Sequence, residues 1–345
     1  MNILCLDGRY FNAYLERLGH HVLHAGTANP GTDRDLQCSR PITALELFET
    51  AKARGFAPDA VLWCDICRPP TVIGLETLPV ATIGYSIDQY VNPWHKPYSA
   101  AFDTFFVAQK DSLPLFAHKD LPRPVAWMPL FYDPDTTQID PNLARDIPVS
   151  FVGTLDGPLN TGRKSFLQAF NTLCPLTTAT GDFRPVYARS RIVLNQSAAG
   201  ELNFRIFEAA ALGAAVLTED VTAGLHDIFS PNENILPPYP RGDAAGAAAI
   251  AKAFLNDPER LAAVAAHGRR LVAAHHSASA RARFLAQTAA EHVAGQTWRA
   301  RLANRAAIRA ETAKCYVFLA TDEALGIPLE HRQAYLQLAQ TYLAG

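Results

Sequence analysis

The chain has 345 residues, a formal net charge of −2 and a hydrophobic fraction of 49%, an ordinary composition for a globular protein with sizeable cores. This charge gives no overall attraction to nucleic acid or to an anionic membrane surface. No apolar run approaches the roughly 18 residues of a membrane span. The first residues, MNILCLDGRY, lack the basic region and cleavage site of a signal peptide. Six scattered cysteines favour a reducing cytoplasm over a disulfide scaffold. We therefore expect a cytoplasmic protein of two domains.

The first part of the chain alternates short apolar strands with helices. We predict strands at Asn2–Leu6, His21–Ala25, Ala60–Cys64, Pro79–Tyr85 and Thr104–Ala108, and helices at Phe11–Leu18, Ile42–Gly55 and Tyr98–Phe102. Fully apolar strands separated by helices are typical of a parallel sheet that is covered on both faces. Residues 1–125 are thus expected to form a first domain of the Rossmann-like α/β type.

A proline-rich, polar stretch between Pro122 and Pro148 predicts an interdomain linker at residues 126–147. A second Rossmann-like domain is expected at residues 148–293. Its predicted strands are Pro148–Gly153, Leu176–Thr180, Ile192–Asn195, Ala214–Leu217 and Asn234–Pro237. Its predicted helices are Lys164–Asn171, Pro185–Ser190, Leu202–Leu212, Ala223–Phe229, Ala244–Asn256, Pro258–Ala274 and Ser277–Val293. Two such domains facing a cleft would hold a ligand outside the carboxyl ends of their strands.

Residues 294–345 form an alanine-rich extension with two predicted helices, Thr297–Thr321 and Leu329–Leu343. We expect them to pack across the domain junction or to form a docking module. Arg301, Arg305 and Arg309 recur every four residues and form a basic stripe. This stripe could bind an acidic partner or the first domain, but a solvated helix face is the favoured interpretation.

The segment Asn195–Asp220 carries the strongest functional signal. It predicts a strand end, a loop, a helix closed by Gly213 and a second buried strand. Arg205 and Glu208 are three residues apart on that helix and share a face. The helix N-terminus and Arg205 suit the phosphates of a nucleotide diphosphate, and Glu208 suits ribose hydroxyls. The alternative is an ordinary αβ unit with a surface ion pair.

Three motifs together resemble the GT-B glycosyltransferases, specifically a group-1-like branch named after spore maturation proteins (CgeB-type). They are DIPVSFVGTLDGPLNTGRKSFLQAF at Asp146–Phe170, the pattern Asn203-x-Arg205-x-Phe207-Glu208, and MPLFYDPD at Met128–Asp135. The resemblance covers most of residues 79–293. It is weaker before that range and does not extend over the helical extension.

The resemblance implies that the second domain holds a nucleotide-sugar donor and the first domain an acceptor. It places Gly153 and Thr154 against the diphosphate, where Arg163 or Lys164 neutralises phosphate charge. Asn203, Arg205 and Glu208 complete the implied donor set. Many retaining members have two glutamates with seven residues between them. Here Gly200 occupies the first of these positions and Glu201 lies one step off, so the stereochemical outcome stays open.

On the acceptor side, polar and aromatic residues follow the predicted strands. Asp88 and His95 are the candidates for a general base. Tyr85–Tyr90 and Trp94 suit a sugar or peptide acceptor, since aromatic faces stack on sugars. Asp65, just past another strand, is expected to face the cleft. The alternative for this region is a capped loop with buried aromatic side chains.

No metal site is predicted. The pairs Asp133-Pro-Asp135 and Asp33-x-Asp35 match an Asp-x-Asp clamp in form, but both lie in turn-forming sequence. The pair Cys64-x-x-Cys67 has no second Cys or His pair nearby. No cofactor is expected apart from the nucleotide sugar itself.

The sequence thus predicts a metal-independent glycosyltransferase that moves a sugar from a nucleotide sugar to a protein, glycan or small molecule. A nucleotide-sugar epimerase of the same fold and a non-catalytic nucleotide-sugar-binding protein remain alternatives. A dinucleotide-dependent oxidoreductase is disfavoured, because the loop after the first strand lacks the G-x-G-x-x-G pattern.

Overall fold

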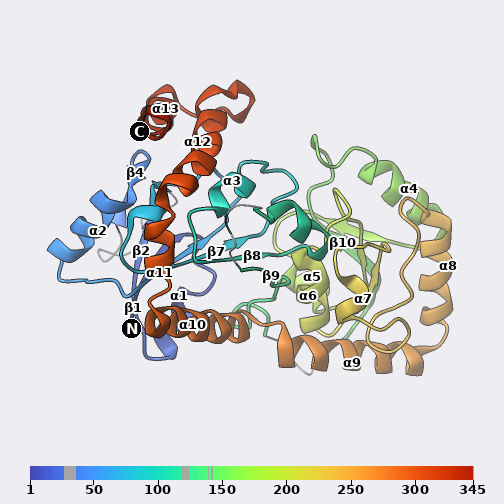
Figure 1. Ribbon diagram of the computed structural model, residues 1–345. Coiled ribbons are helices and arrows are strands. Elements are labelled where there is room, and N and C mark those ends of the chain that lie inside the picture. The colour runs from blue at the N-terminus through green and yellow to red at the C-terminus, as the bar shows by residue number, and fades with distance from the viewer. Residues whose placement is uncertain (27–35, 119–120, 122–123, 139, 141–142, 345) are drawn as a thin grey trace. The chain divides into compact units, whose positions relative to one another are not determined.

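The computed structural model describes residues 1–26, 36–118, 121, 124–138, 140 and 143–344. The pair Asp33-x-Asp35 lies outside these residues. The chain divides into two compact units, coloured by residue number in Figure 1. Unit 1 comprises Met1–Ala108, Ser112–Met128 and Ala282–Gly345, and unit 2 comprises Gln109–Asp111 and Pro129–Arg281. Unit 1 is therefore built from separate pieces of the chain.

Unit 1 contains a sheet of seven parallel strands in the order β3-β2-β1-β5-β7-β8-β9. The strands are β1 (Asn2–Asp7), β2 (His21–Gly26), β3 (Leu36–Gln37), β5 (Ala60–Cys64), β7 (Ala81–Ser86), β8 (Thr104–Val107) and β9 (Val125–Trp127). The predicted strands of this region are all present, whereas the short strands β3 and β9 were not predicted. From β1 the chain runs outward to β2 and β3 and returns at β5. The strand order thus reverses between β1 and β5, where ligands of such sheets commonly bind.

The helices of the first 108 residues are α1 (Asn12–Arg17), α2 (Ala44–Ala53) and α3 (His95–Ser99). A small pair of strands, β4 (Ile42–Thr43) and β6 (Val72–Ile73), forms beside them. The predicted helix Ile42–Gly55 is therefore wrong at its start. Thr43 is extended and its hydroxyl accepts a hydrogen bond from the Glu46 N–H at 3.2 Å. Because Thr43 is the N-cap, the residues before it are free to join a strand.

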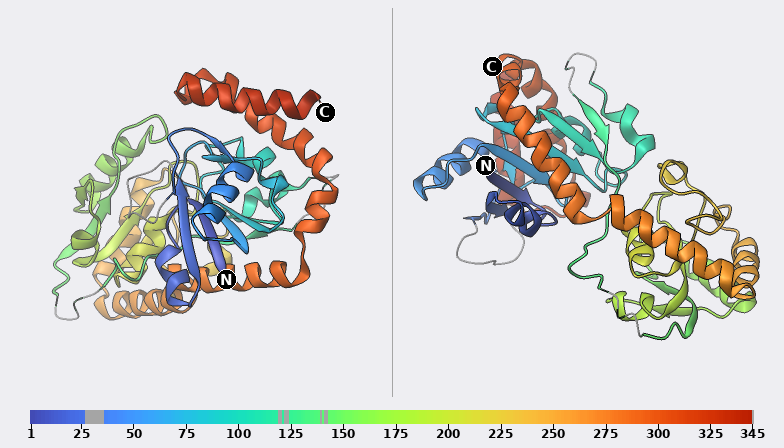
Figure 2. Two further views of the ribbon diagram at one scale, coloured as in Figure 1. Left: turned by 90° about the vertical axis from the view of Figure 1, so that its left-hand side faces the viewer. Right: turned by 90° about the horizontal axis from the view of Figure 1, so that it is seen from below.

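The helical extension belongs to the core of unit 1. After α10 (Ala278–Gly295) come α11 (Trp298–Ala303), α12 (Arg305–Thr321) and α13 (Leu329–Ala344). The single helix predicted at Thr297–Thr321 is interrupted at Asn304. Figures 1 and 2 show α12 and α13 lying side by side as a hairpin. Their buried Tyr316, Leu319 and Tyr335 share one hydrophobic cluster with Trp63 of β5.

One arginine ties α11 to the sheet of unit 1. Arg301 is 3% exposed, and its Nε lies 3.0 Å from Oδ1 of the buried Asp103. The same guanidinium donates to the carbonyl oxygens of Leu75, Leu78 and Val80 at 2.5–3.0 Å. The interpretation of Arg301, Arg305 and Arg309 as one solvated stripe is therefore wrong for Arg301. Arg305 is exposed, and it lies on the next helix.

We predict that Arg301→Ala lowers the free energy of unfolding of unit 1 by about 3–5 kcal/mol, because it leaves the Asp103 carboxylate buried and unpaired. The four tryptophans, residues 63, 94, 127 and 298, all lie in unit 1. Their fluorescence during urea unfolding therefore reports on this unit. Arg305→Ala removes the same charge from an exposed position and should change stability by less than about 0.5 kcal/mol. Equal effects of the two changes would contradict the proposed role of the buried pair.

Unit 2 contains four parallel strands in the order β11-β10-β12-β13. They are β10 (Ile147–Val152), β11 (Thr177–Ala179), β12 (Ser190–Asn195) and β13 (Ala215–Thr218). Its helices are α4 (Arg163–Leu173), α5 (Arg184–Tyr187), α6 (Phe204–Ala211), α7 (Leu225–Ile228), α8 (Ala244–Leu255) and α9 (Pro258–His275). The strand order reverses between β10 and β12, since the chain goes from β10 to β11 and then returns. A ligand site is expected outside the carboxyl ends of these two strands.

The strand predicted at Asn234–Pro237 is wrong. This region makes isolated bridges, Pro231 with Ile235 and Glu219 with Tyr239, and the Leu236 N–H donates to the Val216 carbonyl at 3.0 Å, but it forms no strand. Three prolines follow Leu236 within four residues, and a proline has no N–H to donate to a sheet. The segment still buries Leu236 and Tyr239 in the core of unit 2.

Candidate functional site

Arg205 joins the ends of the two strands between which the order of the unit 2 sheet reverses. Its Nε donates to the carbonyl oxygen of Val152 at 3.1 Å, and its Nη1 donates to Oδ1 of Asn195 at 2.6 Å. Val152 ends β10 and Asn195 ends β12. The guanidinium carbon also lies 4.5 Å from the centre of the Phe151 ring. Arg205 is thus held at the carboxyl edge of the sheet, where a cation can meet an anionic ligand.

Gly153, directly after β10, leaves the space that Arg205 occupies. A Cβ at this position would lie 2.5 Å from Nη2 of Arg205, which is far inside van der Waals contact. The Gly153 N–H donates to the carbonyl of Ala179 at 3.0 Å. A side chain at residue 153 would therefore displace the Arg205 guanidinium from this position.

Arg163 lies at the start of α4 and is buried at 5% exposure. It donates to Oε1 of Gln196 at 2.6 Å, to the Gln196 carbonyl at 3.0 Å and to the Thr154 carbonyl at 2.8 Å. Burial, and then the neighbouring Arg205, lower the pKa of Arg163 to about 10. Arg163 thus clamps the loop after β10 to the loop after β12. Thr154 and Lys164 are exposed beside it.

Glu208 lies one turn after Arg205 on α6 and is half-buried. Burial raises the pKa of its carboxyl to about 7, and Arg205 acts in the opposite direction. The surface ion pair considered above does not form, since the Arg205 guanidinium turns to Val152 and Asn195. Within the described part of the chain, no donor makes a hydrogen bond to this carboxylate. It is therefore available to hydroxyl groups of a ligand.

Asn203 precedes α6 but does not cap it. Its Nδ2 donates to Oδ1 of Asn195 at 2.9 Å, and its buried Oδ1 has no hydrogen-bond partner among the described residues. No side chain caps the first turn of α6. The Ile206 N–H donates to the Asn203 carbonyl at 3.3 Å, whereas no described residue accepts the Arg205 N–H. That N–H is left for an anion, which the helix dipole also favours.

The loop between β12 and α6 is held by two glutamates. The Glu201 carboxylate accepts hydrogen bonds from the N–H groups of Ala198 at 3.0 Å and Ala199 at 2.6 Å. The fully buried Glu219 accepts one from the Ser197 hydroxyl at 2.6 Å. Gly200 has a left-handed backbone with φ of 85°. Glu201 is thus engaged within its own loop, and Gly200 serves the turn.

The acceptor-side candidates of unit 1 surround a buried carboxylate. Asp65 is 0% exposed and accepts hydrogen bonds from the N–H groups of Ile87 at 3.1 Å and Asp88 at 2.7 Å. The expectation that Asp65 faces a cleft is wrong, because its oxygens are used to hold the loop after β7. Its Oδ1 also lies 3.5 Å from Nε2 of His95.

His95 and Asp88 differ in their access to solvent. His95 is 0% exposed, burial lowers its pKa, and its Nδ1 shares a hydrogen bond of 2.8 Å with the Ser86 hydroxyl. Asp88 is half-buried and accepts a hydrogen bond from the Tyr90 hydroxyl at 3.0 Å. Of the two candidates, only Asp88 has access to a substrate in this structure.

A second buried carboxylate lies at the end of β1. Asp7 is 4% exposed and receives hydrogen bonds from Trp63 Nε1 at 2.9 Å and from the Thr71 hydroxyl at 2.6 Å. Burial raises its pKa to about 6. Asp7 has a positive φ of 61°, a conformation that is rare for residues other than glycine. Asp7 ends β1 and Asp65 follows β5, so both lie at the carboxyl ends of the strands between which the order of the unit 1 sheet reverses.

Asp133-Pro-Asp135 forms a turn in the structure. Oδ1 of Asp133 accepts the Asp135 N–H at 3.0 Å, and the Asp133 carbonyl accepts the Thr137 hydroxyl at 2.6 Å. No group of three or more metal-ligating side chains is found among the residues that the model describes. All six cysteines are unpaired.

Several residues of this site were not predicted from the sequence. Phe151 presents its ring to both arginines, and Oδ1 of Asn195 accepts hydrogen bonds from two side chains. Gln196 binds Arg163, and Tyr239 donates to the Asn195 carbonyl at 2.6 Å. The available signal is the polar Asn-Gln pair that follows the apolar residues 192–194, since the end of a parallel strand lies at the carboxyl edge of the sheet.

Comparison with known proteins bears on the same segment. Residues 163–287 match the model of a family described as glycosyl transferase-like. This range begins at Arg163 and includes Arg205 and Glu208. No curated protein has significant sequence similarity to the chain.

Solved structures show the fold. A sucrose-phosphate synthase from Thermosynechococcus elongatus is 14% identical, with a TM-score of 0.60 over 86% of this chain and 100% of that one. Anabaena HepE in complex with UDP-glucose is 13% identical, with a TM-score of 0.61 over 84% and 100%. A glycosyltransferase from Rickettsia africae is 12% identical, with a TM-score of 0.63 over 84% and 98%. The chain therefore has the mixed α/β fold of GT-B glycosyltransferase structures, with parallel sheets and additional helices at the C-terminus. Among the described residues, no helix is both long and apolar enough to cross a membrane.

We predict that the carboxyl group of Glu208 titrates with a midpoint near pH 7, followed by carboxyl ¹³C chemical shifts in NMR. Because its pKa is raised above 4.5 in the folded state, the folded protein binds the extra proton between pH 4.5 and 7. The free energy of unfolding of unit 2 should therefore fall as the pH rises through this range. In the Glu208→Gln variant, the free energy of unfolding should not show the part of this decrease that comes from Glu208. A midpoint below about pH 5 would contradict the prediction.

Proposed function

We propose that the protein is a glycosyltransferase that binds a nucleotide sugar in unit 2 and transfers the sugar to an acceptor held by unit 1. The observation that carries the proposal is the Glu208 carboxylate, one turn from Arg205 and without a hydrogen bond from any described side chain. This pair lies where the strand order of unit 2 reverses, inside the segment that matches the glycosyl transferase-like model.

Each donor-site group has a proposed role. Arg205 and the uncapped first turn of α6 bind the diphosphate, and the exposed Lys164 adds charge from the first turn of α4. Glu208 accepts hydrogen bonds from ribose hydroxyls. Gly153 and Arg163 position this set, Gly153 by leaving room for Arg205 and Arg163 by clamping the loops that flank it.

In the proposed reaction, the bond between the anomeric carbon and the diphosphate oxygen breaks as an acceptor oxygen or nitrogen attacks the sugar. The departing nucleoside diphosphate gains negative charge. Arg205, Lys164 and the helix N–H groups stabilise that charge because they are positioned before the reaction begins. We propose that these groups suffice without a metal ion, so activity should survive addition of EDTA. We also propose a cytoplasmic location, on the basis of the six unpaired cysteines.

Uridine diphosphate is the first nucleotide to test, since HepE, which shares the fold, was solved with UDP-glucose. The acceptor is proposed to be a protein, a glycan or a small molecule, and membership of the spore-maturation-like branch is part of the proposal. The reported matches do not favour the epimerase alternative.

We predict that a tight nucleoside diphosphate raises the melting temperature of the protein, because binding to the folded state alone stabilises it by mass action. At one hundred times its Kd the ligand contributes about 2.7 kcal/mol, which corresponds to a shift of several degrees. A thermal-shift panel of UDP, GDP, dTDP and ADP measures this effect. If no nucleotide shifts the wild-type protein, the donor site is refuted.

Two variants locate the nucleotide. Glu208→Ala should weaken binding by roughly tenfold or more, because a hydrogen bond to a charged group contributes about 1.5–3 kcal/mol. Glu233→Ala removes an exposed carboxylate of the same unit and should leave the shift unchanged. An equal response of both variants would exclude the proposed role of Glu208.

We propose Asp88 as the general base that deprotonates the acceptor, with His95 and Asp65 positioning its loop. Asp88→Asn should lower kcat by about 10²–10⁴-fold while leaving the nucleotide-induced thermal shift intact. Release of UDP from UDP-sugar in the presence of acceptor measures turnover. A variant with wild-type kcat would remove Asp88 from the mechanism.

A further inference from the structure

Unit 2 contains a cavity of about 360 Å³ at the edge of its sheet opposite to the Arg205–Glu208 site. Arg145 precedes β10, Arg191 is the second residue of β12, and Gly213 lies just before β13. All three therefore stand at the amino ends of parallel strands. We call this cavity the α9 groove. It is lined by Arg145, Arg191, Gly213, Pro258, Leu261, Ala262, Ala265, Ala266 and Arg269.

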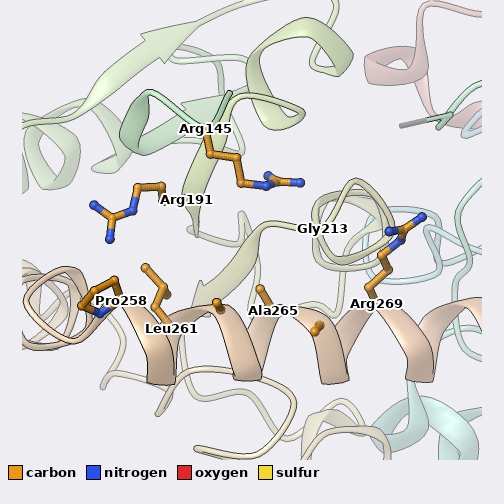
Figure 3. A pocket seen from close by; sticks show the side chains of 9 residues that line it. Arg145, Arg191, Gly213, Pro258, Leu261, Ala265 and Arg269 are labelled. Carbon is orange, nitrogen blue, oxygen red and sulfur yellow. The ribbon is translucent and has the colours of Figure 1, made fainter. Parts of the chain in front are cut away.

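The floor of the α9 groove is apolar. Leu261 and Ala265 are four residues apart on α9, as are Ala262 and Ala266, so these side chains form one face of the helix. Figure 3 shows Leu261 and Ala265 directed from α9 towards the strands, with Pro258 at one end of this row and Arg269 at the other. Three alanines leave a shallow channel along the helix axis. The distance from residue 258 to residue 269 is about 16 Å at the helical rise.

Positive charge lines the α9 groove. Arg269 is exposed, and no described side chain forms a hydrogen bond or ion pair with it. Among the described residues, the Arg191 guanidinium makes one long hydrogen bond, 3.4 Å from Nη2 to the carbonyl oxygen of Leu255. Arg145 donates to the carbonyls of Ser190 at 2.6 Å and Leu212 at 2.5 Å. None of the three forms an ion pair with a described carboxylate.

Among the described acidic side chains next to groove residues in the sequence, Asp146 and Asp257 are engaged elsewhere, and Glu259 is exposed and does not line the groove. Asp146 forms an ion pair with Arg189, and Asp257 caps α9 by accepting the Arg260 N–H at 3.1 Å. Burial, and then the charge of Arg269, lower the pKa of Arg145. Arg145 and Arg269 are thus close enough to repel one another. Because no carboxylate among the described residues lines the groove, a bound anion would neutralise this charge.

We propose that the α9 groove binds a small amphiphilic phosphate, with its phosphate group on Arg269 and Arg145 and its apolar chain along the alanine floor. Arg269 donates hydrogen bonds to the phosphate. Arg145 contributes mainly its positive charge, because carbonyl groups already accept some of its hydrogen bonds. Arginine is suited to this role because its planar group can bind phosphate with two parallel hydrogen bonds. The cavity lies within the range of volumes of small-molecule sites.

Hexyl phosphate is a suitable probe, titrated calorimetrically at constant ionic strength with and without saturating UDP. We expect binding in both cases, since the α9 groove is independent of the proposed donor site. Inorganic phosphate should bind more weakly than hexyl phosphate, because each buried methylene contributes up to about fourfold in affinity. Equal affinities of the two probes would overturn the apolar part of the proposal. Loss of hexyl phosphate binding on adding UDP would overturn the separate location of the site.

Two neighbouring arginines provide a matched pair of variants. Arg269→Gln removes a groove residue, and Arg270→Gln makes the same change one residue further along α9, at an exposed position outside the groove. Arg269→Gln should weaken hexyl phosphate binding at least tenfold, equivalent to about 1.4 kcal/mol, whereas Arg270→Gln should leave it within twofold of wild type. Equal affinities of the two variants would refute the site.

The same phosphate chemistry occurs in lipid headgroups, so the source of the ligand is tested separately. Co-sedimentation with phosphatidylcholine vesicles that contain phosphatidic acid measures membrane binding. We expect no co-sedimentation, since the proposed ligand is a soluble molecule. Co-sedimentation that Arg269→Gln abolishes, without calorimetric binding of hexyl phosphate, would replace the proposed soluble ligand with a membrane surface.

Discussion

The candidate donor site depends on placing two arginines side by side, with no described carboxylate in hydrogen-bond contact with either. Arg163 and Arg205 both lie over the ring of Phe151, at 5.4 Å and 4.5 Å from its centre. Carbonyl oxygens and amide side chains accept their hydrogen bonds. An aromatic face attracts a cation without neutralising its charge. The arrangement therefore keeps positive charge at the edge of the sheet. The loops after β10 and β12 provide the hydrogen-bond acceptors that hold Arg163 in place.

The two units differ in the charge found at the carboxyl edges of their sheets. In unit 2 the residues at the carboxyl ends of the central strands lie beside loops that Arg163 and Arg205 hold by hydrogen bonds. In unit 1 they are Asp7 and Asp65, two buried carboxylates that bind Thr71 and the N–H groups of the loop after β7. Neither carboxylate is exposed. Asp65 fixes the loop that presents Asp88, and Asp7 holds Trp63 and Thr71. The two units thus use charges of opposite sign to position neighbouring segments of the chain.

Most strands of both sheets could be predicted because each contains a short apolar run between turn-forming residues, whereas β3 and β9 are too short to give such a pattern. Element boundaries that depend on hydrogen bonds could not be predicted. At Thr43, for example, the hydroxyl caps α2, so the helix starts after residues 42–43. Arg205 and Glu208 could be placed on one face of α6 from spacing alone. The turn of Arg205 away from Glu208 depends on Val152 and Asn195, which lie 53 and 10 residues away in sequence. Likewise, periodicity could not show that Arg301 is buried, since Asp103 lies 198 residues earlier.

The division of the chain into units also affects how the protein can fold during synthesis. Unit 2 is complete once residue 281 has been made, and apart from Gln109–Asp111 it is one continuous segment. Unit 1 includes Trp63 in a core cluster with Tyr335 and Ala339, which are made only after unit 2 is complete. A ribosome that adds residues in order thus releases a foldable unit 2 before unit 1 has all of its core. The strands of unit 1 keep apolar surface exposed until these residues have been made. Unit 1 is therefore more prone than unit 2 to aggregation and to binding by chaperones.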